Sequence, residues 1–219
     1  MSSPGHIRVK ICGLSTPDTV TAAIDAGADY LGFNFIARSS RYIALETAAE
    51  LARLVPDTVL KVALTIDADD ATLERIVAAL KPDMLQLHGS ESPDRLREIK
   101  GRFGLTLMKA IPIGGPEDLG HTSIYRESAD LLLFDAKPPK SMQNALPGGN
   151  GLVFDWSLIA GEKPDMPWML SGGLTAANVG EAIRITGAEA VDVSSGVEEA
   201  PGRKSPKLIA EFIRAAKSI

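Results

Sequence analysis

Two glycine-containing stretches, Leu170-Ser171-Gly172-Gly173-Leu174 and Asp192-Val193-Ser194-Ser195-Gly196, carry most of the information about the fold of this chain. Each follows a short apolar run, as expected of a turn that leaves a strand. Glycine lets backbone amides approach an anion closely, and the N-terminus of a following helix adds partial positive charge. A single turn of this kind is also typical of ordinary strand-to-helix connections, but together the two predict a phosphate-binding site.

Apolar runs of strand length recur along the whole chain, and the two turns follow the last two of them. Segments with helical spacing separate the runs. In Pro17–Ala26, for example, Val20, Ala23 and Ile24 share one face, and the first helical turn tolerates the proline. Further helices are predicted over Ala44–Leu54, Asp70–Leu80 and Ser205–Ala216. The predicted strands are Arg8–Cys12, Tyr30–Phe35, Lys61–Ile66, Met84–His88, Thr106–Ile111, Leu131–Asp135, Pro167–Ser171 and Ala190–Ser194.

Alternation of strands and helices, without hairpin turns, predicts a parallel sheet joined by right-handed crossovers. Eight such units in 219 residues fit a small α/β protein, a (β/α)8 or TIM barrel. An open doubly wound sheet is the alternative, but it favours a G-x-G-x-x-G turn that Cys12-Gly13-Leu14-Ser15-Thr16-Pro17 lacks. We therefore expect residues 1–219 to form a single barrel domain, with residues 1–6 as a flexible N-terminal tail.

The composition narrows the class of protein. The hydrophobic fraction of 45% and charged fraction of 23% are ordinary for a globular chain. The single cysteine cannot form an internal disulfide, and no apolar run reaches the roughly 18 residues of a membrane helix. A net charge of −5 argues against nucleic acid, and the scattered histidines show no metal-ligand spacing. These features predict a cytoplasmic protein with a small-molecule partner, no membrane or nucleic-acid partner and no metal.

Polar residues occupy alternate positions of several predicted strands. Because side chains alternate between the two faces of a strand, Val9 and Ile11 are expected to face the helices, while Lys10 and Cys12 point into the barrel. The same rule predicts outward Leu132 and Phe134, and inward Gln86, His88, Leu133, Asp135, Asp192 and Ser194. Burial of unpaired polar groups costs several kcal/mol. Two interpretations of Lys10 are possible. It forms an ion pair with an inward acid and stiffens the barrel, or it has a role in a functional site.

Cys12 and Asp135 stand at the C-terminal ends of their predicted strands, where barrel active sites are built. An acid and a thiol facing each other across the barrel mouth can serve as proton donor and acceptor. A thiol can serve as the proton acceptor only if its thiolate form is favoured, and the positive charge of Lys10 is placed to favour it. The alternatives are a cysteine that acts as a small buried hydrophobe and an acid that caps a helix.

Seven stretches, in order and over nearly the whole chain, resemble the signature sequences of phosphoribosylanthranilate isomerases. The opening Lys10-Ile11-Cys12-Gly13 together with Asp192-Val193-Ser194-Ser195-Gly196-Val197-Glu198 is the most specific part. The full set adds Leu14, Gly32-Phe33-Asn34-Phe35, Ser39-Ser40-Arg41-Tyr42-Ile43, Leu85-Gln86-Leu87-His88-Gly89, Leu133-Phe134-Asp135-Ala136 and Ser171-Gly172-Gly173-Leu174.

The resemblance implies an Amadori rearrangement in tryptophan biosynthesis. N-(5-phosphoribosyl)anthranilate becomes 1-(2-carboxyphenylamino)-1-deoxyribulose 5-phosphate, without metal or cofactor. Asp135 would act as general acid on the ribose ring oxygen, and Cys12 as general base at C2. Arg41, in the loop after the second strand, would hold the anthranilate carboxylate, for which its planar fork is suited. Lys10, His88 and Asp192 would be supporting groups of the mouth.

The chain departs from the family pattern in two places, and one of its loops is unusually long. Ser40 stands where the family often has a proline, and we expect it to loosen the loop that presents Arg41. Leu64-Thr65-Ile66 stands where the family often has an aromatic residue. The glycine- and proline-rich connection 137–153 is long for a strand-to-helix loop, which is typical of an active-site lid.

Two other functions are consistent with a phosphate-binding barrel. One is another phosphosugar isomerase, such as the enzyme of the histidine pathway. Two acids would be expected there, and Cys12 argues against it. The other is a non-catalytic phosphometabolite-binding protein, against which the presence of both Cys12 and Asp135 speaks. The sequence leaves the oligomeric state open.

Overall fold

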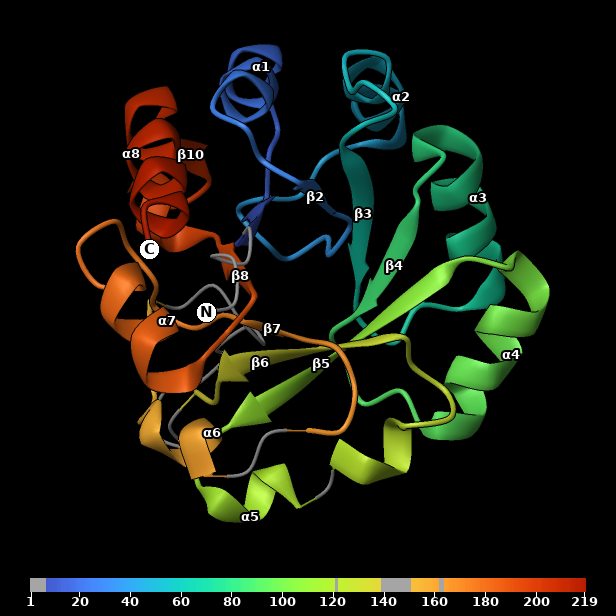
Figure 1. Ribbon diagram of the computed structural model, residues 1–219. Helices are drawn as coiled ribbons and strands as arrows, with labels where there is room; N and C mark the ends of the chain where they lie inside the picture. The colour runs from blue at the N-terminus through green and yellow to red at the C-terminus, as the bar shows by residue number, and fades with distance from the viewer. Residues whose placement is uncertain (1–6, 121, 139–150, 162–163) are drawn as a thin grey trace.

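A closed barrel of parallel strands forms the centre of the molecule, in the order β1-β2-β3-β4-β5-β6-β7-β8 (Figure 1). The structure is a computed structural model that describes residues 7–120, 122–138, 151–161 and 164–219. The predicted tail 1–6 and most of the 137–153 connection lie outside the described residues. The strands are β1 Arg8–Cys12, β2 Tyr30–Asn34, β3 Leu60–Thr65, β4 Met84–Leu87, β5 Thr106–Ile113, β6 Leu131–Ala136, β7 Trp168–Leu170 and β8 Ala190–Val193.

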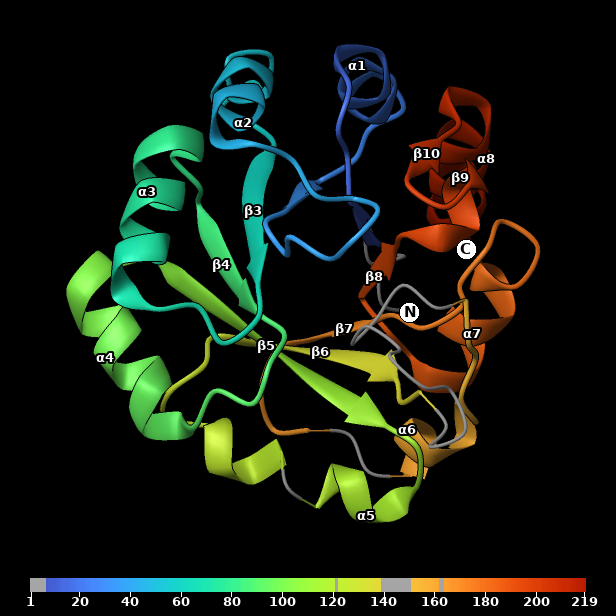
Figure 2. The same ribbon diagram turned by 180° about the vertical axis from the view of Figure 1, so that it is seen from behind.

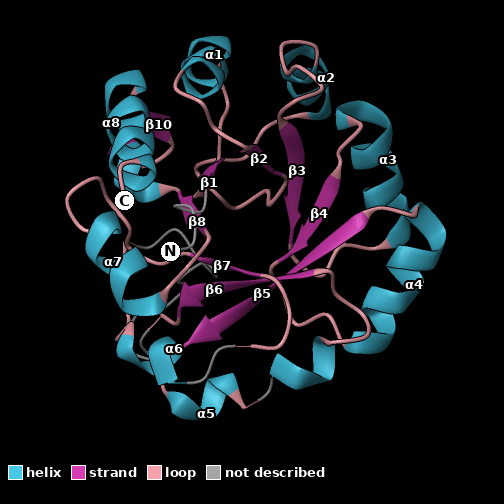
Figure 3. Ribbon diagram, in the orientation of Figure 1, coloured by secondary structure: helices cyan, strands magenta, loops and turns pink. Residues whose placement is uncertain are grey.

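Helices surround the barrel on its outside (Figure 3). They are α1 Pro17–Asp25, α2 Leu45–Ala52, α3 Asp70–Leu80, α4 Pro93–Phe103, α5 Pro116–Leu119, α6 Ser157–Gly161, α7 Val179–Thr186 and α8 Pro206–Lys217. Side-chain caps fix several helix starts: Thr16 accepts the amide of Thr19 before α1, and Asp69 accepts the amide of Thr72 before α3. The predicted TIM barrel is therefore confirmed, and its element boundaries shift by one or two residues.

A short antiparallel hairpin, β9 (Glu198–Ala200) with β10 (Arg203–Lys204), was not expected. The prediction of a chain without hairpins is wrong at this point. Both strands are short and charged, and Pro201-Gly202 joins them, so they lack the apolar run that marks a strand. Seen from behind, the hairpin lies beside α8, after the 3-10 helix Ser195–Val197 that follows β8 (Figure 2).

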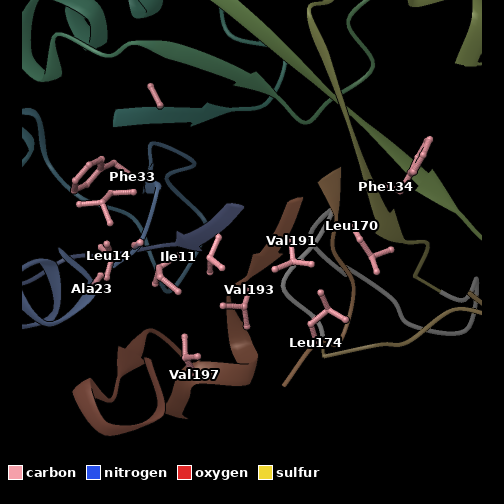
Figure 4. Close-up of a cluster of buried hydrophobic side chains, with 14 of the residues drawn as sticks. Ile11, Leu14, Ala23, Phe33, Phe134, Leu170, Leu174, Val191, Val193 and Val197 are labelled. Atoms are coloured by element: carbon pink, nitrogen blue, oxygen red, sulfur yellow. The ribbon is translucent and has the colours of Figure 1, made fainter. Parts of the chain in front are cut away.

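The core has two parts, one on each face of the strands. The outer part packs strands against helices and contains Val9, Ile11, Leu132 and Phe134, as alternation predicts (Figure 4 shows Ile11 and Phe134 among others). The inner part fills the barrel with Tyr30, Val62, Met84, Met108, Ala110, Leu131, Leu133, Met169 and Ala190. The apolar filling gives way to buried polar side chains toward the C-terminal ends of the strands. In the part of the chain that the structure describes, no helix has the length and apolar character needed to cross a membrane.

Candidate active site

The two glycine-containing turns come together at the C-terminal ends of β7 and β8. Gly172 and Gly173 have φ of 90° and 61°, a region that favours glycine. A Cβ at Gly173 would also lie 2.5 Å from a methyl of Val153, and one at Gly196 would collide with the carbonyl oxygen of Leu174. The two turns line one cavity, together with neighbouring residues: Asp135, Ala136, Gly151, Leu152, Ser171, Gly172, Gly173, Leu174, Asp192, Val193, Ser194 and Ser195.

Lys10 lies inside the barrel, completely buried, and its Nζ is 2.9 Å from Oδ1 of Asp192. The two residues are register partners on the neighbouring strands β1 and β8. The other carboxylate oxygen of Asp192 accepts a hydrogen bond from Oγ of Ser171 at 3.2 Å. Burial opposes the charge on Lys10, but Asp192 and Cys12 outweigh it and raise the pKa of Lys10. The interpretation that Lys10 pairs with an inward acid is confirmed.

Cys12 lies at the end of β1, 4% exposed. Burial raises the pKa of its thiol above the ordinary 9.0, while the charge of Lys10 and its hydrogen bond to the sulfur act in the opposite direction. Gly32 on β2 makes room for this pair, since a Cβ there would be 3.0 Å from both the sulfur and Nζ of Lys10. The charge of Lys10 acts in the direction expected of it, but burial outweighs it and the net pKa of the thiol is raised, so the helping role of Lys10 stays a prediction.

Asp135, at the end of β6, belongs to two cavities. One is the cavity of the glycine-containing turns, and the other opens toward β3–β5 and is lined by Arg38, Ile66, Asp67, His88, Gly89, Ser90, Pro112, Asp135, Ala136, Lys137 and Pro138. Nε2 of His88 is 3.4 Å from Oδ2 of Asp135. Nε2 of Gln86 lies 3.0 Å from Nδ1 of the same ring. The structure therefore brings the predicted acid and the predicted supporting histidine together.

Arg41 is held by a carboxylate that the sequence analysis did not assign. Its Nε and Nη2 donate to the two oxygens of Glu198 at 2.7 and 2.9 Å, in a bidentate pair. Lys204 of β10 joins this pair. Its Nζ lies 2.7 Å from Oε1 of Glu198 and 2.9 Å from the carbonyl oxygen of Ser194. Burial lowers the pKa of Lys204 from its ordinary 10.5, with Glu198 opposing.

Ordinary sequence signals did not reveal Glu198 and Lys204 as site residues. Glu198 ends a family motif, but a charged residue near a turn is normally a solvated one. Lys204 belongs to the short hairpin. The folded structure shows that both side chains are buried, with 4% of Glu198 and 1% of Lys204 exposed.

The loop that presents Arg41 is tied down at several points. Nδ2 of Asn34 donates to Oγ of Ser39 at 3.3 Å, and the same oxygen accepts the amide of Arg41 at 3.1 Å. The hairpin packs on this loop, because a Cβ at Gly202 would collide with the carbonyl oxygen of Ser40. The effect of Ser40 on affinity stays a prediction, but the conformation of the loop depends on these ties.

Among the described residues, no group of three or more histidine, cysteine, aspartate or glutamate side chains is arranged to hold a metal ion. The arrangement instead offers proton transfer. In barrel order, β6, β7, β8 and β1 are consecutive, so Asp135 and Cys12 flank the two glycine-containing turns. The acid lines the cavity between these turns, which suits an anion, and the thiol lies on β1, the strand next to β8.

Comparisons with known proteins agree with this geometry. A family model described as N-(5'-phosphoribosyl)anthranilate (PRA) isomerase matches residues 9–215. The N-(5'-phosphoribosyl)anthranilate isomerase of Parvibaculum lavamentivorans is 70% identical over 211 residues, which is 96% of this chain and 98% of the relative. The phosphoribosyl anthranilate isomerase structure from Thermotoga maritima has a TM-score of 0.87 and 34% identity, covering 97% of this chain and 100% of that one.

A second solved structure is similar to the same extent and contains a ligand. It is a phosphoribosyl anthranilate isomerase in complex with reduced 1-(o-carboxyphenylamino)-1-deoxyribulose 5-phosphate. Its TM-score is 0.84 at 32% identity, with 97% of this chain and 100% of that chain covered.

Proposed function

This chain belongs to the phosphoribosylanthranilate isomerase family, and from that membership we propose that it catalyses the Amadori rearrangement of N-(5-phosphoribosyl)anthranilate in tryptophan biosynthesis. The product is 1-(2-carboxyphenylamino)-1-deoxyribulose 5-phosphate. The reaction is an internal oxidation and reduction, in which C1 of the aldose is reduced and C2 is oxidised to the ketone. The protein would perform it in the cytoplasm, on a small-molecule substrate.

The observation that carries the proposal is the order of groups around the barrel mouth. Asp135 on β6 and Cys12 on β1 stand on either side of the turns after β7 and β8. Asp135 also lines the same cavity as Gly172, Gly173 and Ser194. A phosphate bound to the backbone amides of those turns would fix one end of the sugar, so that the reacting carbons lie between the acid and the base.

Asp135 would give its proton to the ribose ring oxygen, so that the C1–O bond breaks and the Schiff base of the amine forms. Cys12 would then take the proton from C2, and the electrons of that C–H bond move to form the enolamine. The enolamine tautomerises to the ketone. These transfers involve neighbouring atoms and need a donor and an acceptor on opposite sides of the sugar.

The raised pKa of the Cys12 thiol bears on how the base works. The competent state has a proton on Asp135 and none on Cys12, and Lys10 is the charge that favours the thiolate. Because Lys10 is also paired with Asp192, its ammonium stays in place whether or not the thiol is ionised. We therefore assign Lys10 and Asp192 to the support of the base.

Arg41 would bind the anthranilate carboxylate at the end of the substrate remote from the phosphate. Glu198 holds the guanidinium in one plane, and Lys204 offsets the second negative charge that the substrate brings close to Glu198. The proposal thus places one charged anchor at each end of the substrate, with the proton transfers between them.

Turnover measurements on Asp135→Asn and Cys12→Ser test the proposal, with loss of substrate fluorescence as the signal. We expect kcat to fall by about 10²–10⁴, the usual contribution of general acid–base catalysis, with phosphate affinity retained. The matched control is Ser218→Ala on the exposed end of α8. Rates like wild type in either active-site variant would remove that residue from the mechanism. Absence of turnover by the wild-type protein would favour a phosphometabolite-binding protein.

A further inference from the structure

A second buried ion pair lies on the opposite face of the barrel wall, outside the cavity. Nζ of Lys109 on β5 is 2.8 Å from Oε2 of Glu91, and each side chain is 3% exposed. The neighbours of Lys109 on the strand, Met108 and Ala110, belong to the inner core, so Lys109 points outward. The ring of Tyr125 covers the ammonium, with its centroid 5.8 Å away.

The ammonium of Lys109 also holds the backbone on both sides of His88. It donates to the carbonyl oxygen of Leu87 at 3.2 Å and to that of Gly89 at 2.6 Å. Glu91 completes the frame, because its Oε2 accepts the amide of Gly89 at 3.0 Å. The peptide units before and after the histidine are therefore bound to a single buried charge pair.

The frame extends to the neighbouring loop after β3. Oε1 of Glu91 accepts the amide of Asp67 at 2.8 Å, and Oδ1 of Asp67 accepts the amide of Ser90 at 2.8 Å. Gly89 packs so closely here that a Cβ would be 2.5 Å from the Asp67 carboxylate. The two loops thus fix each other, and the position of His88 follows from their contact.

Within this frame the ring of His88 has one orientation. The amide nitrogen of Gln86, a fully buried residue, lies 3.0 Å from Nδ1, and because an amide nitrogen only donates, this pairing corresponds to the ring tautomer with its proton on Nε2. Nε2 faces Oδ2 of Asp135. An N–H aimed at this carboxylate stabilises the anion that is left once Asp135 has given its proton to the substrate.

A buried ion pair is a poor source of stability, since well-packed apolar residues of similar size usually serve as well. A buried ion pair can instead fix the position of the groups that it binds, and here those groups are the peptide units on either side of His88. We propose that Lys109 and Glu91 are positioning residues for the isomerase reaction, which hold His88 so that its Nε2 faces the carboxylate of Asp135. The inference rests on the proposed function, because it assigns a purpose to the Asp135 carboxylate.

The test is the double variant Lys109→Met/Glu91→Leu, which replaces the buried ion pair with apolar side chains of similar size. We expect kcat to fall about tenfold, as misplacement of a catalytic group costs up to 10²-fold, with KM within twofold because the glycine-containing turns are untouched. The control is Lys207→Gln/Glu211→Gln, an exposed pair on α8, which should leave both constants unchanged.

A double-mutant comparison separates positioning from general destabilisation. In a His88→Gln background, removal of the Lys109–Glu91 pair should cost less than twofold in kcat, because the residue to be positioned is gone. The same tenfold loss in both backgrounds would overturn the proposal, and so would a folded double variant with wild-type kcat. If the double variant does not fold, Glu91→Gln replaces it, and an unchanged kcat there would also overturn the proposal.

Nitrogen NMR of the His88 ring gives a readout that does not depend on turnover. The wild type should show the Nε2–H form, assigned by its absence in His88→Gln, and the double variant should show a mixture of both forms. Retention of the pure Nε2–H form in the double variant would overturn the positioning role. If instead the wild-type protein showed no turnover while the ring spectrum changed as expected, the proposed function would fail and the positioning of His88 would stand.

Discussion

Two buried lysine–carboxylate pairs of similar length occupy the two faces of the barrel wall. Lys10 and Asp192 are 2.9 Å apart inside the barrel, and Lys109 and Glu91 are 2.8 Å apart outside it. The charge of the inner ammonium acts on the Cys12 thiol and opposes the effect of burial on its pKa, whereas the outer ammonium binds backbone carbonyls beside His88. Two pairs of the same chemistry thus have different targets. The inner pair acts on a reacting side chain, and the outer pair holds the backbone around His88.

The difference follows from the period of two in a strand. An inward side chain near the C-terminal end of a barrel strand reaches the cavity, and an outward one reaches the loops and helices. Loss of either lysine would leave an uncompensated carboxylate in a buried place, so the two pairs should be alike in stability. They should differ in catalysis, and that contrast can be measured.

The largest effect is expected for the inner pair. Lys10→Met should destabilise the protein by about 3–5 kcal/mol, because Asp192 keeps a buried charge without its partner. Lys10→Met/Asp192→Leu should recover most of that stability and still lose about 10²–10³ in kcat/KM, because the thiolate has lost its cation. Urea unfolding and turnover measure the two quantities. Recovery of activity along with stability would show that the inner pair is structural only.

The single variant Lys109→Met should show the opposite balance. Its loss of stability should again be about 3–5 kcal/mol, since Glu91 is left buried and unpaired. The activity of the folded fraction should fall only about tenfold, because the reacting groups are untouched and only the position of His88 changes. A loss as large as that of the inner pair would contradict the distinction between the two faces of the wall.

Lys204 and Glu198 form a third buried lysine–carboxylate pair, and substitution of Glu198 tests whether this pair acts on stability, on catalysis or on both. Burial opposes the charge of Glu198, but hydrogen bonds from Arg41 and the charge of Lys204 lower its pKa below the ordinary 4.5. Its stabilisation is therefore present above pH 4.5 and is lost as the pH falls through the lower, folded-state value. Glu198→Gln should cost about 2 kcal/mol at pH 7, and the difference from wild type should shrink at acid pH.

Thermal unfolding at a series of pH values measures this dependence. A stability difference that stays constant down to pH 3 would contradict the assigned role of the Glu198 charge. The same variant should raise KM more than it lowers kcat, since Glu198 orients Arg41 and lies away from the proton transfers.

The smallest expected effect concerns the pH dependence of the reaction. Because the base must be a thiolate and burial raises the pKa of the Cys12 thiol above 9.0, activity should still be rising with pH at pH 9. Removal of the inner pair takes away the cation that opposes burial, so the rise should move to still higher pH. Removal of the outer pair should leave it in place. A rise in activity that is complete well below pH 9 in the wild type would show that another group limits the reaction.

Much of the fold and part of the site could be predicted without coordinates. Periodicity located the strands to within one or two residues, because a buried parallel strand needs a continuous apolar run. Alternation placed Lys10, Cys12, Asp135 and Asp192 on the inward side. Glycines marked the turns after β7 and β8, since positive φ at Gly172 and Gly173 and close packing at Gly196 disfavour other residues.

The partners of these residues were beyond prediction. Glu198 binds Arg41 across 157 positions of sequence, and Asp192 binds Lys10 across 182. The β9–β10 hairpin could not be predicted because it has no apolar run. The role of Lys109 could not be predicted either, because the alternation of side chains along a strand does not show which loops lie against its outer face.

The amino-acid sequence by itself determined which side chains lie on which face of each strand, because the period of the backbone is local. It also determined where the chain turns, because glycine conformations and apolar runs are local as well. Only the tertiary structure decided which buried charges meet. Barrel closure sets β8 beside β1, and the pairing of β4 with β5 sets Leu87 beside Lys109; such contacts depend on how the whole chain folds rather than on any one segment of it.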